Sequence, residues 1–269
     1  MSRLAALFTS LKTQGRKALV PYIVAGDPEP SVTVNLMHEL VRQGADIIEL
    51  GVPFSDPMAE GPVIQLAHER ALAHHVSLTM ALAMVAEFRE TDSKTAVVLM
   101  GYANPIERMG YSVFAERAAA AGLDGLLTVD MPPEEGEEPS RILKAAGIDN
   151  IFLLAPTTDN ARIAKIAALA SGYLYCVALK GVTGAGNLDV ASVTQLLNNI
   201  KAHTDLPITV GFGIKDGASA AALAPLCEGV VVGSALIERL VAADRTQDSG
   251  VWIASVAGLI GEMRAAIDA

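Results

Sequence analysis

The stretch DIIELGVPFSDPMAEGP, residues 46–62, contains a complete transition from strand to helix. Its apolar run carries an acid, Glu49, near the end, a loop rich in Pro and Asp follows, and Pro62 is placed to open a helix at its first turn. A short apolar run, a turn and a helical segment together form a βα unit. The number of times this unit recurs along the chain decides the fold.

Seven further apolar runs of strand length flank this stretch, separated by Gly, Pro and Asp turns and by longer segments of helical period. Two of them, 97–100 and 151–154, are apolar without alternation, as expected of parallel strands covered on both faces. The predicted strands are Ala18–Val24, Asp46–Leu50, Ala96–Met100, Gly125–Val129, Asn150–Leu154, Leu174–Ala178, Pro207–Gly211 and Gly229–Val232. Eight βα units and a closed parallel sheet are therefore predicted.

The helices also have signals in the sequence. Ser31 is predicted to cap a helix after the first strand. A further amphipathic helix is expected before that strand, because four apolar residues recur there at helical spacing. These residues are Leu4, Leu7, Phe8 and Leu11.

The length of the chain favours one closed barrel. A (β/α)8 barrel takes about 250 residues, and the chain has 269, so we expect a single α/β domain over residues 1–269 with an extra N-terminal helix. An open doubly wound sheet can also contain eight βα units. The N-terminal helix and the glycine loops after the last two strands favour the barrel, in which functional side chains lie at the C-terminal ends of the strands.

Composition argues against several classes of protein. Lys and Arg number 20 against 30 Asp and Glu, a net charge of −10, which argues against nucleic acid or an anionic membrane as the main partner. Hydrophobic residues reach 51% and charged residues 19%, the opposite of a disordered chain. No export signal is predicted at the start of the chain. The two cysteines, Cys176 and Cys227, lie far apart, so a reducing cytoplasm is the expected location.

Glu49 is the leading candidate for chemistry. A carboxylate that points into a barrel is desolvated, which raises its pKa and suits it to proton transfer. The alternative is a structural carboxylate paired with a lysine or with backbone groups. Glu60 precedes a glycine in the following loop and by itself is more typical of a solvated acid, while Asp46 and Asp56 are interpreted as turn and loop acids.

Two glycine motifs follow successive strands. TVGFGI at 209–214 ends the seventh strand, and VVGSA at 231–235 leads from the eighth strand into a helix. Glycines let a phosphate approach backbone N–H groups, and a helix N-terminus adds further N–H donors. We therefore predict a phosphate site, with ordinary turn glycines as the alternative; Lys215 is the only cation nearby in the sequence. The segment 180–187, KGVTGAGN, is either a lid or a flexible connection.

No metal or cofactor site is predicted in this chain. The histidines lie in helical segments without the spacing of metal ligands, and they are interpreted as surface or packed residues. They are His38, His68, His74, His75 and His203.

Six motifs, taken in chain order, closely resemble the tryptophan synthase α family. They are IELGVPFSDPMAEGP at 48–62, LMGYANPI at 99–106, VDMP at 129–132, KGVTGAG at 180–186, GFGIKDG at 211–217 and VVGSA at 231–235. The resemblance spans essentially the whole chain. It implies a TIM barrel and a lyase of tryptophan biosynthesis that cleaves indole-3-glycerol phosphate to indole and glyceraldehyde 3-phosphate.

The resemblance also implies residue roles. Glu49 matches the family's catalytic glutamate, which protonates indole C3 and assists deprotonation of the glycerol hydroxyl. Glu60 matches the second acid, usually an aspartate, which meets the indole N–H, and Tyr175 matches an active-site tyrosine. The residues expected to contact substrate are Tyr22, Met100, Leu127, Val129, Leu153 and Phe212 around the indole, Thr183 in the lid, and Gly184, Gly211, Gly213, Gly233 and Ser234 around the phosphate.

A partner is implied in the same way: a pyridoxal-phosphate-dependent β subunit that receives indole in an α2β2 heterotetramer, so that this chain needs no cofactor of its own.

The residues alone leave two alternatives open. One is another phosphate-binding barrel enzyme, such as a phosphosugar isomerase or indole-glycerol-phosphate synthase; a synthase is expected to use lysines at strand ends, which strands two to five lack. The other is a non-catalytic subunit that activates a partner enzyme, against which Glu49 and the phosphate loops argue.

Overall fold

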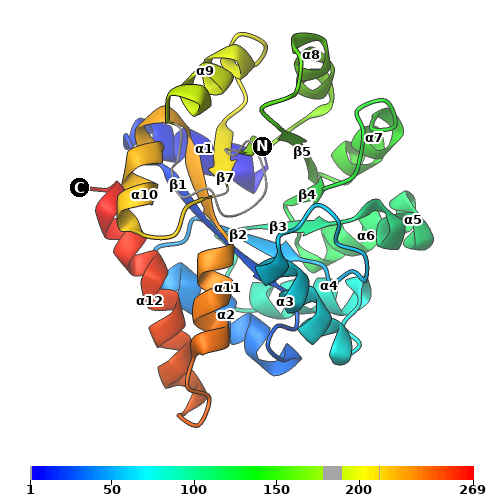
Figure 1. Cartoon of the computed structure of the whole chain (residues 1–269). Coiled ribbons are helices and arrows are strands. Elements are labelled where there is room, and N and C mark those ends of the chain that lie inside the picture. Colours follow the sequence, from blue (N-terminus) through cyan, green and yellow to red (C-terminus); the bar gives the residue numbers. More distant parts are fainter. Residues whose placement is uncertain (1, 178–189, 212) are drawn as a thin grey trace.

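The strands of the chain form one closed parallel barrel (Figure 1). The computed structural model describes residues 2–177, 190–211 and 213–269. Each strand pairs in parallel with the next, and β8 pairs with β1. The strands are β1 (Ala18–Val24), β2 (Ile47–Gly51), β3 (Ala96–Gly101), β4 (Gly125–Thr128), β5 (Asp149–Leu154), β6 (Leu174–Val177), β7 (Ile208–Gly211) and β8 (Gly229–Val232). The predicted (β/α)8 barrel is confirmed.

Helices surround this barrel on its outside, except α1, which lies behind the strands in Figure 1. They are α1 (Arg3–Thr13), α2 (Pro30–Arg42), α3 (Pro62–Ala73), α4 (Leu78–Arg89), α5 (Ala103–Met109), α6 (Tyr111–Ala121), α7 (Glu137–Ala145), α8 (Asn160–Leu169), α9 (Val190–Lys201), α10 (Gly217–Leu223), α11 (Ser234–Ala242) and α12 (Ser249–Ile267), with a short 3₁₀ turn at Ala224–Leu226.

Two helices, α2 and α3, begin at prolines, whereas α1, α4, α8, α10 and α12 have a side-chain N-cap. Pro62 opens α3, as predicted. The predicted cap at Ser31 is wrong: α2 begins one residue earlier, at Pro30, and Glu29 occupies the N-cap position without a side-chain hydrogen bond. Proline has a φ preset for the first helical turn and no N–H to leave unsatisfied, so its position decides where the helix begins.

The extra helix α1 packs across the N-terminal end of the barrel. Leu4 is fully buried, and a Cβ built at Gly125 of β4 would lie 3.3 Å from it. Phe8 packs against Tyr173 with ring centroids 5.9 Å apart. The predicted N-terminal helix is confirmed, and it supports Tyr173 from below.

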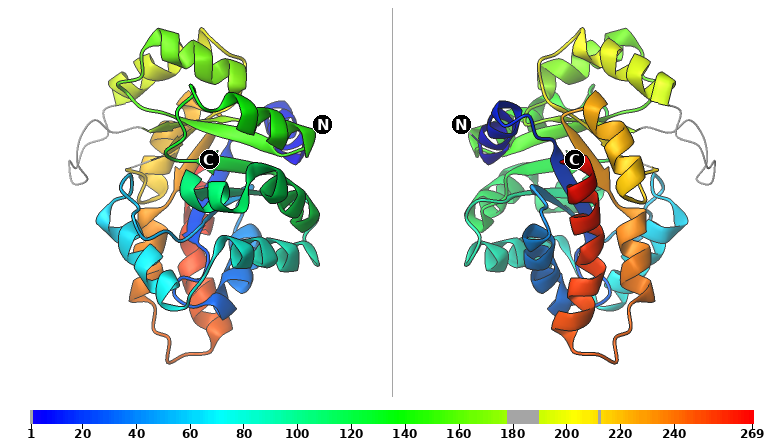
Figure 2. Two further views of the ribbon diagram at one scale, coloured as in Figure 1. Left: turned by 90° about the vertical axis from the view of Figure 1, so that its right-hand side faces the viewer. Right: turned by 90° about the vertical axis from the view of Figure 1, so that its left-hand side faces the viewer.

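Helix α12 is the longest helix that the structure describes and, by length and composition, is apolar enough to span a membrane. It packs along the outside of the barrel against α2, α10 and α11, and Figure 2 shows it running beside α11. Trp252, Val256 and Ile260 are buried there. Packing on the barrel therefore accounts for its apolar composition.

Acids placed just before three strands tie the N-terminal end of the barrel together. Each carboxylate accepts a hydrogen bond from a backbone N–H group of the preceding strand in the barrel. The bonds are Leu19 N to Asp46 (2.9 Å), Val97 N to Asp124 (2.8 Å) and Ile208 N to Glu228 (2.9 Å). The interpretation of Asp46 as a turn acid agrees with this role, because its carboxylate lies at the end of the barrel opposite the active-site loops.

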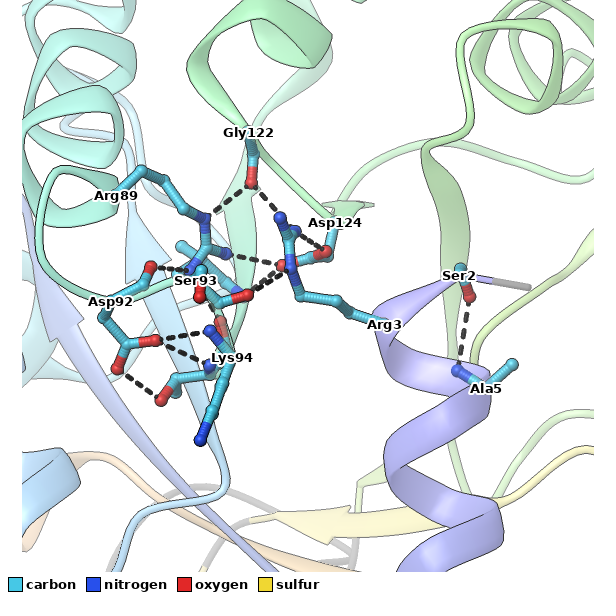
Figure 3. Close-up of polar contacts among 11 residues, drawn as sticks. Ser2, Arg3, Ala5, Arg89, Asp92, Ser93, Lys94, Gly122 and Asp124 are labelled. Atoms are coloured by element: carbon cyan, nitrogen blue, oxygen red, sulfur yellow. Dashed lines mark hydrogen bonds and ion pairs between the residues drawn. The ribbon is translucent and has the colours of Figure 1, made fainter.

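Asp124 is the centre of the most buried of these clusters (Figure 3). Its side chain is 4% exposed and pairs with Arg89 at 2.7 Å and with Arg3. Arg89 also donates to the carbonyl oxygens of Gly122 (2.9 Å) and Thr95 (2.7 Å). Because Arg89 is only 10% exposed, while Arg3 is 37% exposed, the Arg89 charge depends most on this carboxylate.

We predict that Asp124→Asn lowers the free energy of unfolding by about 3 kcal/mol, because it removes the carboxylate that pairs directly with the buried Arg89 guanidinium. Arg3→Gln is the matched control and should cost less than about 1 kcal/mol, since the Arg3 pair is partly solvated. Urea unfolding measures both. Equal losses for the two variants would contradict the importance of burial in this cluster.

Candidate active site

Glu49 lies in the middle of β2, fully buried. Its Oε1 accepts a hydrogen bond of 2.6 Å from the Tyr173 hydroxyl. Its Oε2 is buried and has no hydrogen-bond partner among the described atoms. A buried carboxyl oxygen without a partner is costly for a folded protein, so one side of this carboxyl is fixed and the other is left available for a ligand.

The surroundings of Glu49 favour its protonated form. Burial is the main cause and raises its pKa to about 7; the Glu60 charge acts in the same direction, and the Tyr173 hydrogen bond opposes both. A carboxyl with a pKa near neutrality both donates and accepts a proton at the pH of a cell. Within the part of the chain that the structure describes, neither a lysine nor a backbone N–H donates to the Glu49 carboxyl, as a purely structural carboxylate would require.

The loop that carries Glu60 is held from several sides. The Ala59 N–H donates to the Tyr102 hydroxyl at 3.1 Å, and Tyr102 stacks on Phe54 with ring centroids 5.0 Å apart. From α3, the Gln65 side-chain amide donates to the Glu60 carbonyl oxygen at 2.8 Å. These contacts fix the backbone around Glu60.

Glu60 differs from an ordinary solvated loop acid. Its side chain is half-buried at the C-terminal mouth of the barrel, and this desolvation raises its pKa to about 7. Its charge also raises the pKa of Glu49. The structure therefore brings two carboxyls with near-neutral pKa values to one end of the barrel.

Two tyrosines point toward the same mouth. Tyr175 of β6 is buried, and a Cβ built at Gly211 would lie 1.9 Å from its hydroxyl oxygen, so the hydroxyl crosses the end of β7. Burial raises the pKa of Tyr175, and the charges of Glu49 and Glu60 raise it further. Tyr22 of β1 is the neighbour of Glu49 in the strand register. Both tyrosines therefore stay protonated beside the two carboxyls.

Three of the residues expected around the indole lie on the adjacent strands β3, β4 and β5, next to Tyr175. Met100 of β3 is aligned with Leu127 of β4, and Leu153 of β5 with Tyr175 of β6. Leu127 is fully buried, Met100 is 8% exposed, and Val129 follows β4 half-buried. These side chains supply an apolar surface between β3 and β6.

The two glycine loops come together because β7 and β8 are neighbours. Gly211 ends β7, and Gly213 has a φ of +79°, which favours glycine. Ser234 is the first residue of α11, and Gly233 at the N-cap position provides no side chain to cap it. The Leu236 N–H donates to the Gly233 carbonyl oxygen at 2.9 Å, whereas no described residue accepts the N–H groups of Ser234 and Ala235, which are therefore open to an anion. Three predicted site residues, Thr183, Gly184 and Phe212, lie outside the described residues.

Three site residues were missed by sequence reasoning: Tyr173, Tyr102 and His68. Tyr173 had a readable signal, since it lies two residues before Tyr175 and shares its face by strand alternation. His68 had one too. It occupies the buried stripe of α3, four residues after Ile64, and is only 2% exposed.

Among the described residues, no three His, Cys, Asp or Glu side chains are grouped so as to bind a metal ion.

Comparison with known proteins gives one consistent family. The model of the family described as "Tryptophan synthase alpha chain" matches residues 8–267. The tryptophan synthase alpha chain of Thioalkalivibrio sulfidiphilus is 58% identical over 268 residues and covers all of both chains. That of Nitrosococcus oceani is 58% identical over 269 residues, covering 100% of this chain and 98% of its own.

Solved structures agree. Tryptophan synthase subunit alpha from Legionella pneumophila superposes with a TM-score of 0.91 at 46% identity, covering 100% of this chain and 99% of that one. A chain of tryptophan synthase from M. tuberculosis gives a TM-score of 0.87 at 34% identity, covering 99% and 100%. The chain therefore belongs to the tryptophan synthase alpha chain family, the lyases that cleave indole-3-glycerol phosphate.

Proposed function

We propose that Glu49 transfers the protons in the cleavage of indole-3-glycerol phosphate and that Glu60 stabilises the charge that develops on the indole nitrogen. The observation that carries the proposal is the Glu49 carboxyl itself: fully buried, held at Oε1 by Tyr173, unpartnered at Oε2 among the described atoms, and with a pKa near 7. Such a group is suited to hold a proton at a defined atom and to give it to carbon.

The reaction then balances without an external reagent. Protonated Glu49 delivers its proton to indole C3, which places a positive charge on the ring nitrogen beside ionised Glu60. The Glu49 carboxylate next takes the proton of the hydroxyl on the carbon bonded to C3. That hydroxyl carbon becomes the aldehyde of glyceraldehyde 3-phosphate as the carbon–carbon bond breaks, and the electron pair returns to the indole ring. Glu49 ends protonated, as it began.

The two carboxyls have to be in opposite states for this sequence. Both have a pKa near 7: burial raises each one, and the Glu60 charge raises that of Glu49 further. Near neutral pH, a coupled pair of this kind holds a single proton over a range of pH. We assign that proton to Glu49, because its burial is complete and that of Glu60 is not.

Substrate binding is proposed to use the remaining parts of the mouth. The indole ring lies against Tyr22, Met100, Leu127, Val129 and Leu153, and Tyr175 flanks the carboxyls. The phosphate binds to the backbone amides of the β7 and β8 loops, at Gly211, Gly213, Gly233 and Ser234. In the family pattern Phe212, Thr183 and Gly184 complete this site.

We further propose that the chain works as one domain with a tryptophan synthase β subunit, in an α2β2 complex, and that pyridoxal phosphate belongs to that subunit. The relatives named as tryptophan synthase support this partner. The segments 53–58, 104–110 and 130–136 after β2, β3 and β4, the second of which is helical as α5, are the proposed docking surface. The net charge of −10 and the biosynthetic role fit a cytoplasmic enzyme.

Glu49→Gln should lower turnover about 10²–10⁴-fold, because an amide has nearly the same size but neither delivers nor accepts the proton. Binding of glyceraldehyde 3-phosphate should stay within about twofold, since the phosphate loops are unchanged. Indole release from indole-3-glycerol phosphate measures the first effect, and calorimetry the second. If Glu49→Gln kept more than about a tenth of the unmodified turnover, Glu49 would not be the residue that transfers the protons.

Ser234→Asp should weaken binding of glyceraldehyde 3-phosphate by about tenfold or more, because the new carboxylate repels the phosphate at the start of α11. Ser234→Asn is the matched control with similar size and no charge. Gly213→Val is the less clean test, since the φ of +79° would strain valine regardless of the ligand. Equal affinities for the Asp and Asn variants would place the phosphate elsewhere.

A further inference from the structure

A buried histidine connects the Glu60 loop to the barrel wall. His68 of α3 accepts the backbone N–H of Phe54 at its Nδ1, over 3.0 Å, and its Nε2 lies 3.2 Å from the Tyr22 hydroxyl oxygen. A backbone N–H only donates, so Nδ1 carries no proton. Burial lowers the pKa of His68 to about 4, so the ring is neutral. The single ring proton is therefore on Nε2 and is donated to Tyr22.

This tautomer fixes the direction of the Tyr22 hydroxyl. Its oxygen accepts from His68, so its own proton has to point away from α3. A Cβ built at Gly51, the last residue of β2, would lie 2.4 Å from the Tyr22 oxygen, so the hydroxyl lies above Glu49 at the level of the mouth. Among the described residues, none accepts this proton within hydrogen-bonding distance. The hydroxyl is a donor prepared for a group that arrives there.

The groups that face this hydroxyl are mainly acidic. Burial raises the pKa of Tyr22 well above its usual value, and of the neighbouring charges Glu60 acts most strongly. The neighbouring titratable groups are Glu60, Glu49, Tyr102 and Tyr175, with His68 on the opposite side. Glu49 already has one oxygen occupied by Tyr173, whereas no described residue donates a hydrogen bond to the Glu60 carboxylate, which sits on a loop whose backbone is fixed.

We propose that Tyr22 is a positioning residue for Glu60: His68 holds the Tyr22 oxygen as an acceptor, so that the hydroxyl donates to the ionised Glu60 carboxylate and holds it at the indole nitrogen. The inference rests on the proposed role of Glu60. It adds a chain of contacts from the Phe54 backbone through His68 and Tyr22 to the second acid. The loop that carries Glu60 thus also supplies, through Phe54, the contact that directs its carboxylate.

The test is single-turnover cleavage of indole-3-glycerol phosphate as a function of pH. Tyr22→Phe keeps the ring against the indole and removes the hydroxyl. We expect a roughly tenfold slower rate, the size of one lost hydrogen bond to a charged group. On the acidic side of the pH–rate profile, the rate falls as Glu60 becomes protonated. The midpoint of this limb should rise by about one pH unit, because ionised Glu60 loses its hydrogen-bond donor.

Two further variants make the test specific. In a Glu60→Gln background, Tyr22→Phe should have less than about a twofold effect, because the charge that it serves is gone. His68→Asn keeps an oxygen for the Phe54 N–H and removes the donor to Tyr22, so it should move the same limb in the same direction by less. Tyr111→Phe removes another buried hydroxyl, outside the site, and should leave the rate and the profile unchanged.

The outcomes separate this inference from the proposed function. If Tyr22→Phe slows cleavage equally in both backgrounds without moving the limb, Tyr22 acts only on the shape of the indole site; the inference is then overturned while the role of Glu60 stands. If Glu60→Gln alone leaves the rate close to that of the unmodified chain, the proposed function of Glu60 fails and this inference fails with it.

Discussion

Desolvation of the Glu49 carboxyl is the constraint on which the rest of the site depends. The barrel closes around β2 and removes water from this group, and its pKa rises from an ordinary 4.5 to about 7. The folded chain therefore binds this proton more tightly than the unfolded chain, and the contribution of Glu49 to stability falls as the pH rises from about 4.5 to about 7. Part of the stability of the fold is given up at neutral pH to keep a carboxyl that has a pKa near 7.

The barrel supports this group with packing from both ends. At the N-terminal end, α1 places Phe8 against Tyr173, and Tyr173 holds one oxygen of Glu49. At the C-terminal end, Tyr102 and Gln65 hold the loop of Glu60. The acids that precede β2, β4 and β8 bind backbone N–H groups at the opposite end of the barrel from the active-site loops. Acidic side chains thus serve structure at one end of the strands and, in the proposed mechanism, chemistry at the other.

Sequence periodicity was sufficient for the fold, because eight apolar runs with turn residues between them specify the order of parallel strands. It also placed Glu49, since an acid in an otherwise apolar strand is costly to bury unless its carboxyl has a chemical role, and the two glycine loops, since β7 and β8 have to be neighbours. It could not place Glu60, because a loop acid is desolvated only by side chains from other elements. His68 is the clearest miss. The sequence left it as a surface or packed residue, and its two hydrogen bonds, to Phe54 and Tyr22, join three segments whose contact cannot be read from residue spacing.

The most direct test of the account is the titration of the Glu49 carboxyl itself. Carbon-13 labelling of glutamate side chains, with Glu49→Gln to identify the signal, gives its pKa by NMR in the full chain. The account predicts a midpoint near pH 7 that moves down in Glu60→Gln, because removal of the Glu60 charge removes part of the upward shift. A midpoint near the ordinary value of 4.5 would contradict it, because Glu49 would then hold no proton to give to indole at neutral pH.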